Sequence, residues 1–381
     1  MVSYGKALII FATLTIKVLF RTDASLQIGT GHVMRCLTLA NALREHGAEC
    51  RFVSREHPGN LLEWIRKQGF EAVALPVQDD AAPAAAGAGE PTLAHAYWLG
   101  TDWFSDAQQT QLAMGQQAVD WMVVDHYSLD ARWERVLRPH CRKLLVIDDI
   151  ADREHICDVL LDQNMVEFMN ERYKSKVPEI CTCLLGPKYA LLRPEFSQLR
   201  SASIARRATP RLEHLLIFLG GSDANNETAK VIEGVKLANR KWLHIDVVVG
   251  QSFPALDILR KQLASLPMSM LHIQTSGMAQ LMLDADLAIT SGGSVTWEKC
   301  ALGLPSLVVI QGDNQHPIAT RMHELGAQRT LGISEKLTPT IYAHALDAIL
   351  PNDLIAMSQS AQAVCDGSGI EAVMHTMEIS T

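Results

Sequence analysis

From residue 17 onward the chain alternates short β-rich runs with amphipathic helical stretches, and this alternation constrains the fold more than any other feature. The first apolar run, at residues 18–20, is followed by a helical stretch from about residue 33 to residue 46. Its apolar residues recur every three or four positions. Strands that alternate with helices are typical of parallel sheets, because two parallel strands need a crossover connection. The sequence therefore predicts an α/β fold.

Length and repetition predict two domains. A chain of 381 residues exceeds one ordinary hydrophobic core, and a second series of strands begins after the basic stretch 200–211. We expect a Rossmann-like domain over residues 17–205 and another over residues 206–381, facing each other across a cleft. The final stretch, from about Ile370, is expected to form a helix that packs back on the first domain. Further strands are predicted at residues 51–53, 122–124, 144–147, 215–218, 247–249, 287–289 and 307–309.

Two segments stand outside this pattern. Residues 1–16 include an apolar run that is too short to span a bilayer, and we expect them to be an N-terminal extension. Residues 79–90 are rich in alanine, glycine and proline, and we expect a surface insertion without an assigned function.

Composition excludes several classes of partner. A net charge of −8 gives no basic footprint for nucleic acid, and no segment predicts a membrane partner. The eight cysteines contain no Cys-x-x-Cys pair, which favours reduced thiols in a cytoplasmic protein over a metal or redox motif. The oligomeric state stays open.

The turn Gly29-Thr30-Gly31-His32 joins the first strand to the first helix. Glycines let a ligand approach the backbone closely, and a helix that begins here points unpaired N–H groups at an anion. A histidine at this position can transfer a proton near neutral pH. The turn therefore predicts chemistry beside a phosphate, although a βα turn with a surface histidine has the same pattern.

Two similar turns follow strands in the second half. Gly221 and Ser222 lie in the first, which we expect to mirror the early turn with a second helix N-terminus. Ser294 closes the other, and Glu298 follows in the next helix, where a carboxylate can accept hydrogen bonds from ribose hydroxyls or can simply favour the helix N-terminus. Residues 311–315 follow a later strand, and their cluster of amides and one acid, which includes Asn314, suits hydrogen bonding to sugar hydroxyls or acetamido groups. None of these turns completes a Walker or dinucleotide fingerprint.

Polar residues also end two strands of the first half. In Asp125-His126-Tyr127, a carboxylate or a tyrosine hydroxyl can fix the tautomer of a catalytic histidine. Asp148-Asp149 is interpreted as a polar strand end, because adjacent side chains on a strand point opposite ways and no neighbouring pattern indicates a metal site.

Together these segments resemble the UDP-2,4-diacetamido-2,4,6-trideoxy-β-L-altropyranose hydrolases of pseudaminic acid biosynthesis. The resemblance covers nearly the whole chain from Lys17, and its most specific part is the opening. The segments that carry it are residues 21–25, 29–36, 124–127, 185–189, 220–223 and 291–294. The later turns are shared with nucleotide-sugar glycosyltransferases of the GT-B fold.

The resemblance implies a GT-B architecture and a UDP-sugar substrate. It implies that water attacks the anomeric carbon with inversion, which releases UDP and the diacetamido sugar. His32 matches the family's catalytic histidine and Tyr127 its associated tyrosine. The resemblance also implies uridine and diphosphate contacts around Gly221, Ser294 and Glu298, and a sugar contact near Asn314. From the glycine turns themselves, we expect Gly29, Gly31 and Ser222 to bind the substrate as well.

The chemistry requires no metal and no cofactor, because UDP is a stable leaving group and a positioned base can activate water. Two other functions use the same turns: a GT-B glycosyltransferase with a UDP-sugar donor, and a nucleotide-sugar-binding protein without catalysis. Incubation with the UDP-sugar and no acceptor separates the hydrolase from both.

Overall fold

The computed structural model describes residues 15–77, 93–115, 118–221, 223, 225–251, 253–266 and 268–379. Of these, residues up to 160, with 177–182 and 379, form one compact unit, and residues 161–176 and 183–378 form a second. The expected extension, apart from residues 15 and 16, and the expected insertion at 79–90 lie outside the described residues.

The first sheet has the strand order β3-β2-β1-β4-β5-β6-β7. The pairs β3–β2, β2–β1, β1–β4 and β4–β5 are parallel. Its strands are β1 (Lys17–Thr22), β2 (Glu49–Arg55), β3 (Glu71–Leu75), β4 (Val119–Asp125), β5 (Cys141–Ile147), β6 (Val159–Asp162) and β7 (Thr182–Leu185). The helices that accompany the strands up to β5 are α1 (Gly31–Glu45), α2 (Leu62–Lys67), α3 (Trp103–Met114) and α4 (Ala131–Leu137), with 3₁₀ turns η1 (Ala96–Leu99) and η2 (Arg138–His140).

The second sheet is wholly parallel, with the order β10-β9-β8-β11-β12-β13. Its strands are β8 (His214–Phe218), β9 (His244–Val249), β10 (Ser269–Ile273), β11 (Leu287–Ser291), β12 (Ser306–Ile310) and β13 (Arg329–Ile333). The predicted α/β class and the predicted parallel strands are thus confirmed.

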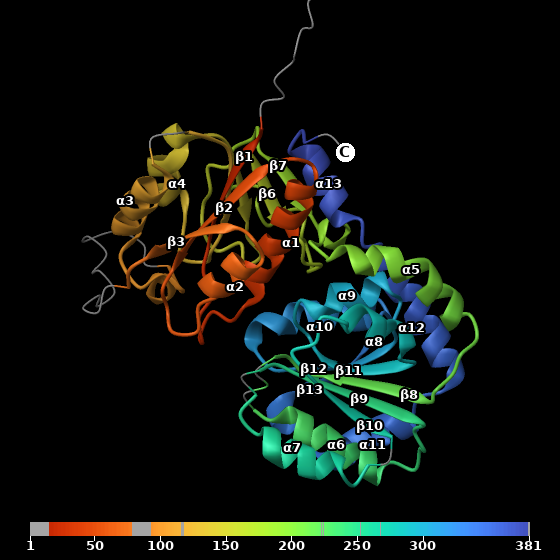
Figure 1. The fold of residues 1–381 in the computed structure, drawn as a ribbon. Helices are drawn as coiled ribbons and strands as arrows, with labels where there is room; N and C mark the ends of the chain where they lie inside the picture. Colours follow the sequence, from red (N-terminus) through yellow and green to blue (C-terminus); the bar gives the residue numbers. More distant parts are fainter. Residues whose placement is uncertain are drawn as a thin grey trace, which may run out of the picture. The chain divides into compact units, whose positions relative to one another are not determined.

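Helices cover both faces of the second sheet (Figure 1). One face packs on α6 (Glu227–Leu237), α7 (Leu256–Leu263), α11 (Pro339–Asp347) and part of α12 (Pro351–Val364). The other face packs on α5 (Pro194–Arg207), α8 (Met278–Asp284), α9 (Val295–Ala301) and α10 (His316–Glu324). The remaining elements are η3 (Pro187–Tyr189), η4 (Asp313–Gln315), η5 (Ser334–Lys336) and α13 (Gly369–Thr376).

The last helices of the chain, α12 and α13, contact elements that precede residue 206, namely α5 and η3. Helix α13 packs on η3, and Cys365 donates a hydrogen bond from Sγ to the carbonyl of Pro187 at 3.3 Å. Helix α5 packs on α8 and α9, so contacts place it with the second unit although it precedes the expected boundary at 205/206.

Both sheets reverse their strand order at one point, between β1 and β4 in the first and between β8 and β11 in the second. Open α/β sheets bind ligands at the carboxyl ends of the strands that flank such a switch point. The turn after β1, the end of β4 and the turns after β8 and β11 are therefore the places where each unit is expected to bind a ligand.

A buried ionic cluster lies next to the carboxyl ends of β1 and β2, close to the switch point of the first sheet. Arg21 Nη2 on β1 and Arg55 Nη2 on β2 both bind Asp106 Oδ2 of α3 at 2.6 Å, and Trp133 donates its indole N–H to Asp106 Oδ1 at 2.9 Å. Arg21 also binds Asp23 at 2.6 Å. All five side chains are fully buried. The cluster ties the carboxyl ends of β1 and β2 to α3.

Removing one partner of this cluster is expected to destabilise the first unit strongly, because the remaining charges stay buried. Asp106→Asn should lower the free energy of unfolding by about 3–5 kcal/mol, measured by urea denaturation. The matched control is Asp257→Asn on α7, where the carboxylate is 88% exposed and the expected change is below about 0.5 kcal/mol. A loss below about 1 kcal/mol for Asp106→Asn would contradict the anchoring role.

Candidate functional site

The turn between β1 and α1 leaves its backbone accessible. Gly29 has a φ of 78°, a conformation that glycine adopts without strain, and its N–H bonds to the carbonyl of Ser25 at 2.9 Å. Helix α1 begins at Gly31, and no side chain caps its first turn. A Cβ added at Gly29 or Gly31 would meet no atom within 4 Å. The turn therefore has an uncapped helix start with open space at both glycines, which the predicted anion site requires.

His32 lies in the first turn of α1 and is largely buried. Its Nδ1 is 2.6 Å from Oδ1 of Asp125, the last residue of β4. Burial alone would raise the pKa of Asp125, but the charges of Arg35 and His32 hold it below its usual value. The ionised carboxylate therefore accepts a hydrogen bond from Nδ1–H of His32. Nε2 of His32 makes no hydrogen bond within the described part of the chain and reaches solvent. Nε2 is thus the ring nitrogen of His32 that is left without a partner among the described residues, and it is the atom from which this imidazole could act as a general base.

Arg35 and Asp149 complete this arrangement. Arg35, one helical turn after His32, makes two hydrogen bonds to Asp125, from Nε at 2.6 Å and from Nη2 at 2.7 Å. Its Nη1 bonds to Asp149 at 2.8 Å, and Tyr127 donates its hydroxyl to the same carboxylate. The adjacent acids at the end of β5 are therefore more than the polar strand end expected from the sequence, since one of them joins the site.

Tyr127 contacts His32 through its ring and not through its hydroxyl. The two ring centroids lie 4.6 Å apart, edge to face, and the Tyr127 ring also stacks on Trp98, with centroids 5.7 Å apart. Burial and the charge of Asp149 raise the pKa of Tyr127 well above its ordinary value, so the hydroxyl stays protonated. Of the two tautomer-fixing groups that the sequence left open, the carboxylate of Asp125 is the one that binds the imidazole.

Formal charges show what proton uptake does to this cluster. Two carboxylates and one guanidinium sum to −1 while the imidazole is neutral, and to zero when it is protonated. An imidazolium at His32 therefore neutralises a buried negative charge.

The turn after β8 corrects one expectation. Asp223 accepts the backbone N–H groups of Glu227 at 3.0 Å and of Thr228 at 2.8 Å. Its carboxylate therefore occupies the first turn of α6, which the sequence analysis assigned to a ligand phosphate. Gly221 instead approaches the neighbouring turn, where its carbonyl accepts the N–H of Gly250 at 2.9 Å. Ser222 lies outside the described residues.

Two glutamines join the three turns of the second unit. Gln311 donates from Nε2 to Asp223 at 3.0 Å, which links the end of β12 to the turn after β8. Gln315 accepts the N–H of Gly292 at 3.2 Å and that of Gln311 at 3.0 Å through Oε1, which links η4 to the turn after β11. The structure thus brings together the second-half turns that the sequence singled out separately. Ser294 and Asn314 are both exposed beside these links.

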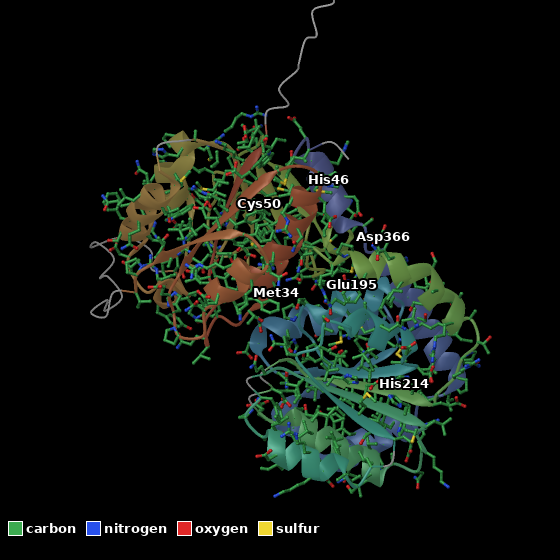
Figure 2. The ribbon with its side chains drawn as sticks, viewed as in Figure 1. Met34, His46, Cys50, Glu195, His214 and Asp366 are labelled. Carbon is green, nitrogen blue, oxygen red and sulfur yellow. The ribbon has the colours of Figure 1, made fainter. Side chains whose placement is uncertain are left out.

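Glu298 lies on α9, partly buried, one turn after Ser294. Within the described part of the chain its carboxylate has no hydrogen bond or ion pair. Burial raises the pKa of Glu298 to about 7, with Arg193 opposing and Glu195 adding to the effect. Glu195 lies at the start of α5 in the same unit (Figure 2). A half-buried carboxylate without a partner is a candidate for ligand binding.

Sequence reasoning gave no role to Arg35 or Asp149. It placed Gln311 and Gln315 in a cluster of amides suited to a sugar, but it did not predict their links to the other turns. Arg35 carried a usable signal, because residues three apart share one face of a helix. The other three act through contacts that only the strand order creates, since Asp149 and Arg35 are 114 residues apart.

No family model matches the chain. Among curated proteins, it is 25% identical over 311 residues to UDP-2,4-diacetamido-2,4,6-trideoxy-β-L-altropyranose hydrolase of Campylobacter jejuni, which covers 81% of this chain and 97% of that protein. The resemblance that the motifs indicate is thereby confirmed. It is also 28% identical over 188 residues, 49% of the chain, to the spore coat polysaccharide biosynthesis protein SpsG of Bacillus subtilis.

An uncharacterised protein of Methanocaldococcus jannaschii, MJ1062, is 26% identical over 304 residues, 78% of this chain. The chain spans only about half the length of this protein and of SpsG, at 56% and 55%.

Solved structures share the fold at low identity. MurG of Acinetobacter baumannii matches with a TM-score of 0.65 and 14% identity over 96% of this chain and all of that chain. UGT89C1 of Arabidopsis thaliana, crystallised with UDP, matches with a TM-score of 0.61 and 13% identity over 95% and 100%. The fold is therefore the α/β fold of the GT-B class. No helix among the described residues is long and apolar enough to cross a membrane.

The environment of Glu298 predicts a titration that requires no ligand. Its side-chain carboxyl should titrate near a pKa of about 7 when followed by ¹³C NMR. Glu195→Gln should lower that pKa, because it removes a neighbouring negative charge, and Arg193→Gln should raise it. A value near 4.5 in the unmodified chain would contradict the burial of this group.

Proposed function

We propose that the chain is a nucleotide-sugar enzyme that hydrolyses UDP-2,4-diacetamido-2,4,6-trideoxy-β-L-altropyranose to UDP and the free sugar, with inversion and without a metal. One observation carries this proposal: a His32–Asp125 pair at the switch point of the first sheet, in which Nε2 of the imidazole makes no hydrogen bond within the described part of the chain. The similarity to the Campylobacter jejuni hydrolase over 81% of the chain supports the substrate.

His32 is the general base in this proposal. Nε2 accepts a proton from water as the water oxygen forms a bond to the anomeric carbon. The bond between that carbon and the β-phosphate oxygen breaks, and its electron pair leaves with UDP. Asp125 holds the tautomer and stabilises the imidazolium, while Arg35 and Tyr127 position Asp125 and the ring.

The uncapped first turn of α1 assists the leaving group. Gly29 and Gly31 leave room for a phosphate in front of its N–H groups. Charge that develops on the diphosphate is stabilised by donors that already point outward. Because Asp223 fills the first turn of α6, we assign no phosphate contact to that helix.

The second unit binds the uridine nucleotide in this proposal. Glu298 accepts the ribose hydroxyls, the exposed turn at Ser294 and the backbone near Gly221 contact the diphosphate, and Asn314 contacts the sugar. The unpartnered carboxylate of Glu298 supports this assignment. So does the likeness in fold to UGT89C1, which has been crystallised with UDP.

A glycosyltransferase is the second candidate, because the structural neighbours MurG and UGT89C1 share the fold and the same base can deprotonate an acceptor hydroxyl. Incubating the chain with the UDP-sugar and no acceptor separates the two. Free sugar and UDP in equal amounts support the hydrolase, and intact substrate supports the transferase or a binding protein.

Replacing the base should abolish chemistry and spare binding. His32→Gln is expected to lower the rate of sugar release by about 10²–10⁴-fold or more, because water loses its proton acceptor. The dissociation constant for UDP, measured by calorimetry, should stay within about threefold. The matched control is His46→Gln, at the C-terminal cap of the same helix. Equal rates for His32→Gln and His46→Gln would remove His32 from the base role.

Glu298 should make UDP binding depend on pH. Only the ionised carboxylate accepts hydrogen bonds from both ribose hydroxyls, so affinity should rise about 10-fold between about pH 6 and pH 8 as a group with a pKa of about 7 ionises. Glu298→Gln should bind UDP more weakly at pH 8 and keep only the pH dependence that UDP itself contributes. Identical pH profiles for the two proteins would exclude Glu298 from the nucleotide site.

A further inference from the structure

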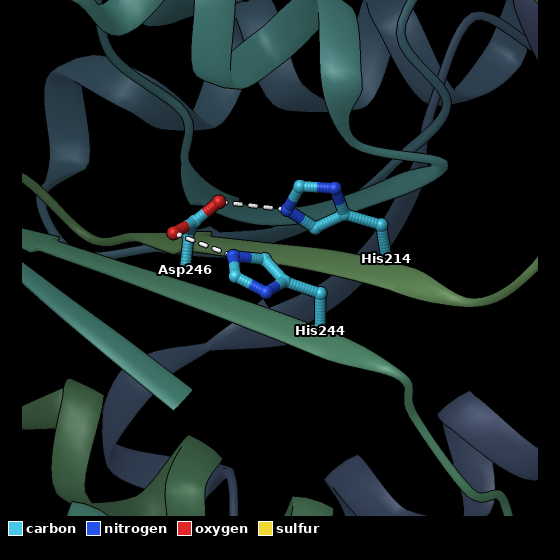
Figure 3. Close-up of side chains that lie close together, drawn as sticks. All are labelled: His214, His244 and Asp246. Atoms are coloured by element: carbon cyan, nitrogen blue, oxygen red, sulfur yellow. Dashed lines mark hydrogen bonds and ion pairs between the residues drawn. The ribbon is translucent and has the colours of Figure 1, made fainter. Parts of the chain in front are cut away.

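Three histidines of the second unit surround one carboxylate, away from the turns of that unit discussed above. Asp246 on β9 accepts from Nε2 of His214 on β8 at 2.7 Å, of His244 on β9 at 3.1 Å and of His272 on β10 at 2.7 Å. Figure 3 shows the first two imidazoles converging on the carboxylate from adjacent strands. We name these four residues the histidine cluster.

The parallel register of the sheet sets this geometry. His214 pairs with His244 across β8 and β9, and Asp246 follows His244 by two positions, so all three lie on one face of the sheet. The rings of His214 and His244 lie 4.5 Å apart, edge to face. The donor positions are therefore held by backbone pairing and not by a mobile loop.

We propose that His214, His244 and Asp246 form a binding site for a divalent transition-metal ion of the zinc class, and that His272 orients the carboxylate. One ligand atom from each of the three residues lies within 4.8 Å of the other two. Tetrahedral zinc at about 2.0–2.1 Å from each ligand needs separations of roughly 3.3 Å, so small side-chain rotations suffice. Two imidazoles with one carboxylate are a ligand set that zinc accepts.

The carboxylate of the proposed site is buried, whereas its imidazoles are partly exposed to solvent. The side chain of Asp246 is 3% exposed, whereas those of His214 and His244 are 15% and 33% exposed. An ion can reach the imidazoles from solvent, and a fourth coordination position remains for water. Within the described residues, no other group of three or more such side chains brings its ligand atoms together in this way.

The position of the cluster separates it from the proposed nucleotide site of the second unit. His214 and His244 are the first residues of β8 and β9, at the opposite end of these strands from the turn at Gly221. An ion there joins adjacent strands at the amino end of the sheet. Its expected effect is on the stability of the second unit and not on the reaction.

The test is binding of Zn²⁺ alone to the chelator-treated full chain, measured by calorimetry. We expect one equivalent per chain, and visible absorption typical of tetrahedral cobalt when Co²⁺ replaces Zn²⁺. His214→Asn and His244→Asn should each weaken binding by at least about 100-fold. His272→Asn should weaken it by about 10-fold, as expected for a residue that orients a ligand.

The matched control is His344→Asn, which removes an exposed imidazole from α11 and should leave binding unchanged. In case a ligand variant misfolds, ¹⁵N NMR of the unmodified chain supplies a second readout, since Zn²⁺ should shift Nε2 of His214 and His244. No binding of Zn²⁺, binding that survives both ligand substitutions, or shifts confined to other histidines would overturn the proposal.

Discussion

The carboxylate of Asp125 holds the first unit's site together, because it is buried and must be paired. It accepts hydrogen bonds from Nδ1 of His32 and from Nε and Nη2 of Arg35. One of its oxygens also lies 3.6 Å from Sγ of Cys36. These contacts join the last residue of β4 to the first turn and a half of α1. They fix the helix against the strand, the imidazole against the carboxylate, and the tautomer that leaves Nε2 open. A buried charge that needs all of these partners tolerates little displacement of any of them.

Further buried charges hold together the strands that carry the His32–Asp125 pair. Asp23, directly beyond β1, binds Arg21 and accepts the backbone N–H of Arg55, and Nε2 of His126 lies 3.2 Å from it. Burial alone would raise the pKa of Asp23, but Arg21 and His126 hold it well below its ordinary value. The carboxyl ends of β1, β2 and β4 are therefore locked together by ion pairs and hydrogen bonds. The open turn at Gly29 and Gly31 rests on this rigid base.

The local sequence pattern predicted the fold, because residues close together in the chain determine both the alternation of strands with helices and the glycine turns. The α/β class, the turn before α1 and the turns after β8 and β11 were all predicted from short segments. Pairings such as Arg35 with Asp149 depend on strand order, and a histidine cluster built from β8, β9 and β10 depends on register. No short-range pattern contains that information. Asp223 is different, since an aspartate before a helix is a known capping signal that the sequence did carry.

The central claim is that His32 directs water to the anomeric carbon of a UDP-sugar. Hydrolysis in H₂¹⁸O without an acceptor tests it most directly, with mass spectrometry of both products and NMR of the first sugar anomer formed. Attack of water at the anomeric carbon should place one ¹⁸O on the anomeric hydroxyl and none in UDP, and it should give an inverted anomer. Label in the β-phosphate of UDP, a retained anomer, or substrate that stays intact until an acceptor is added would contradict it.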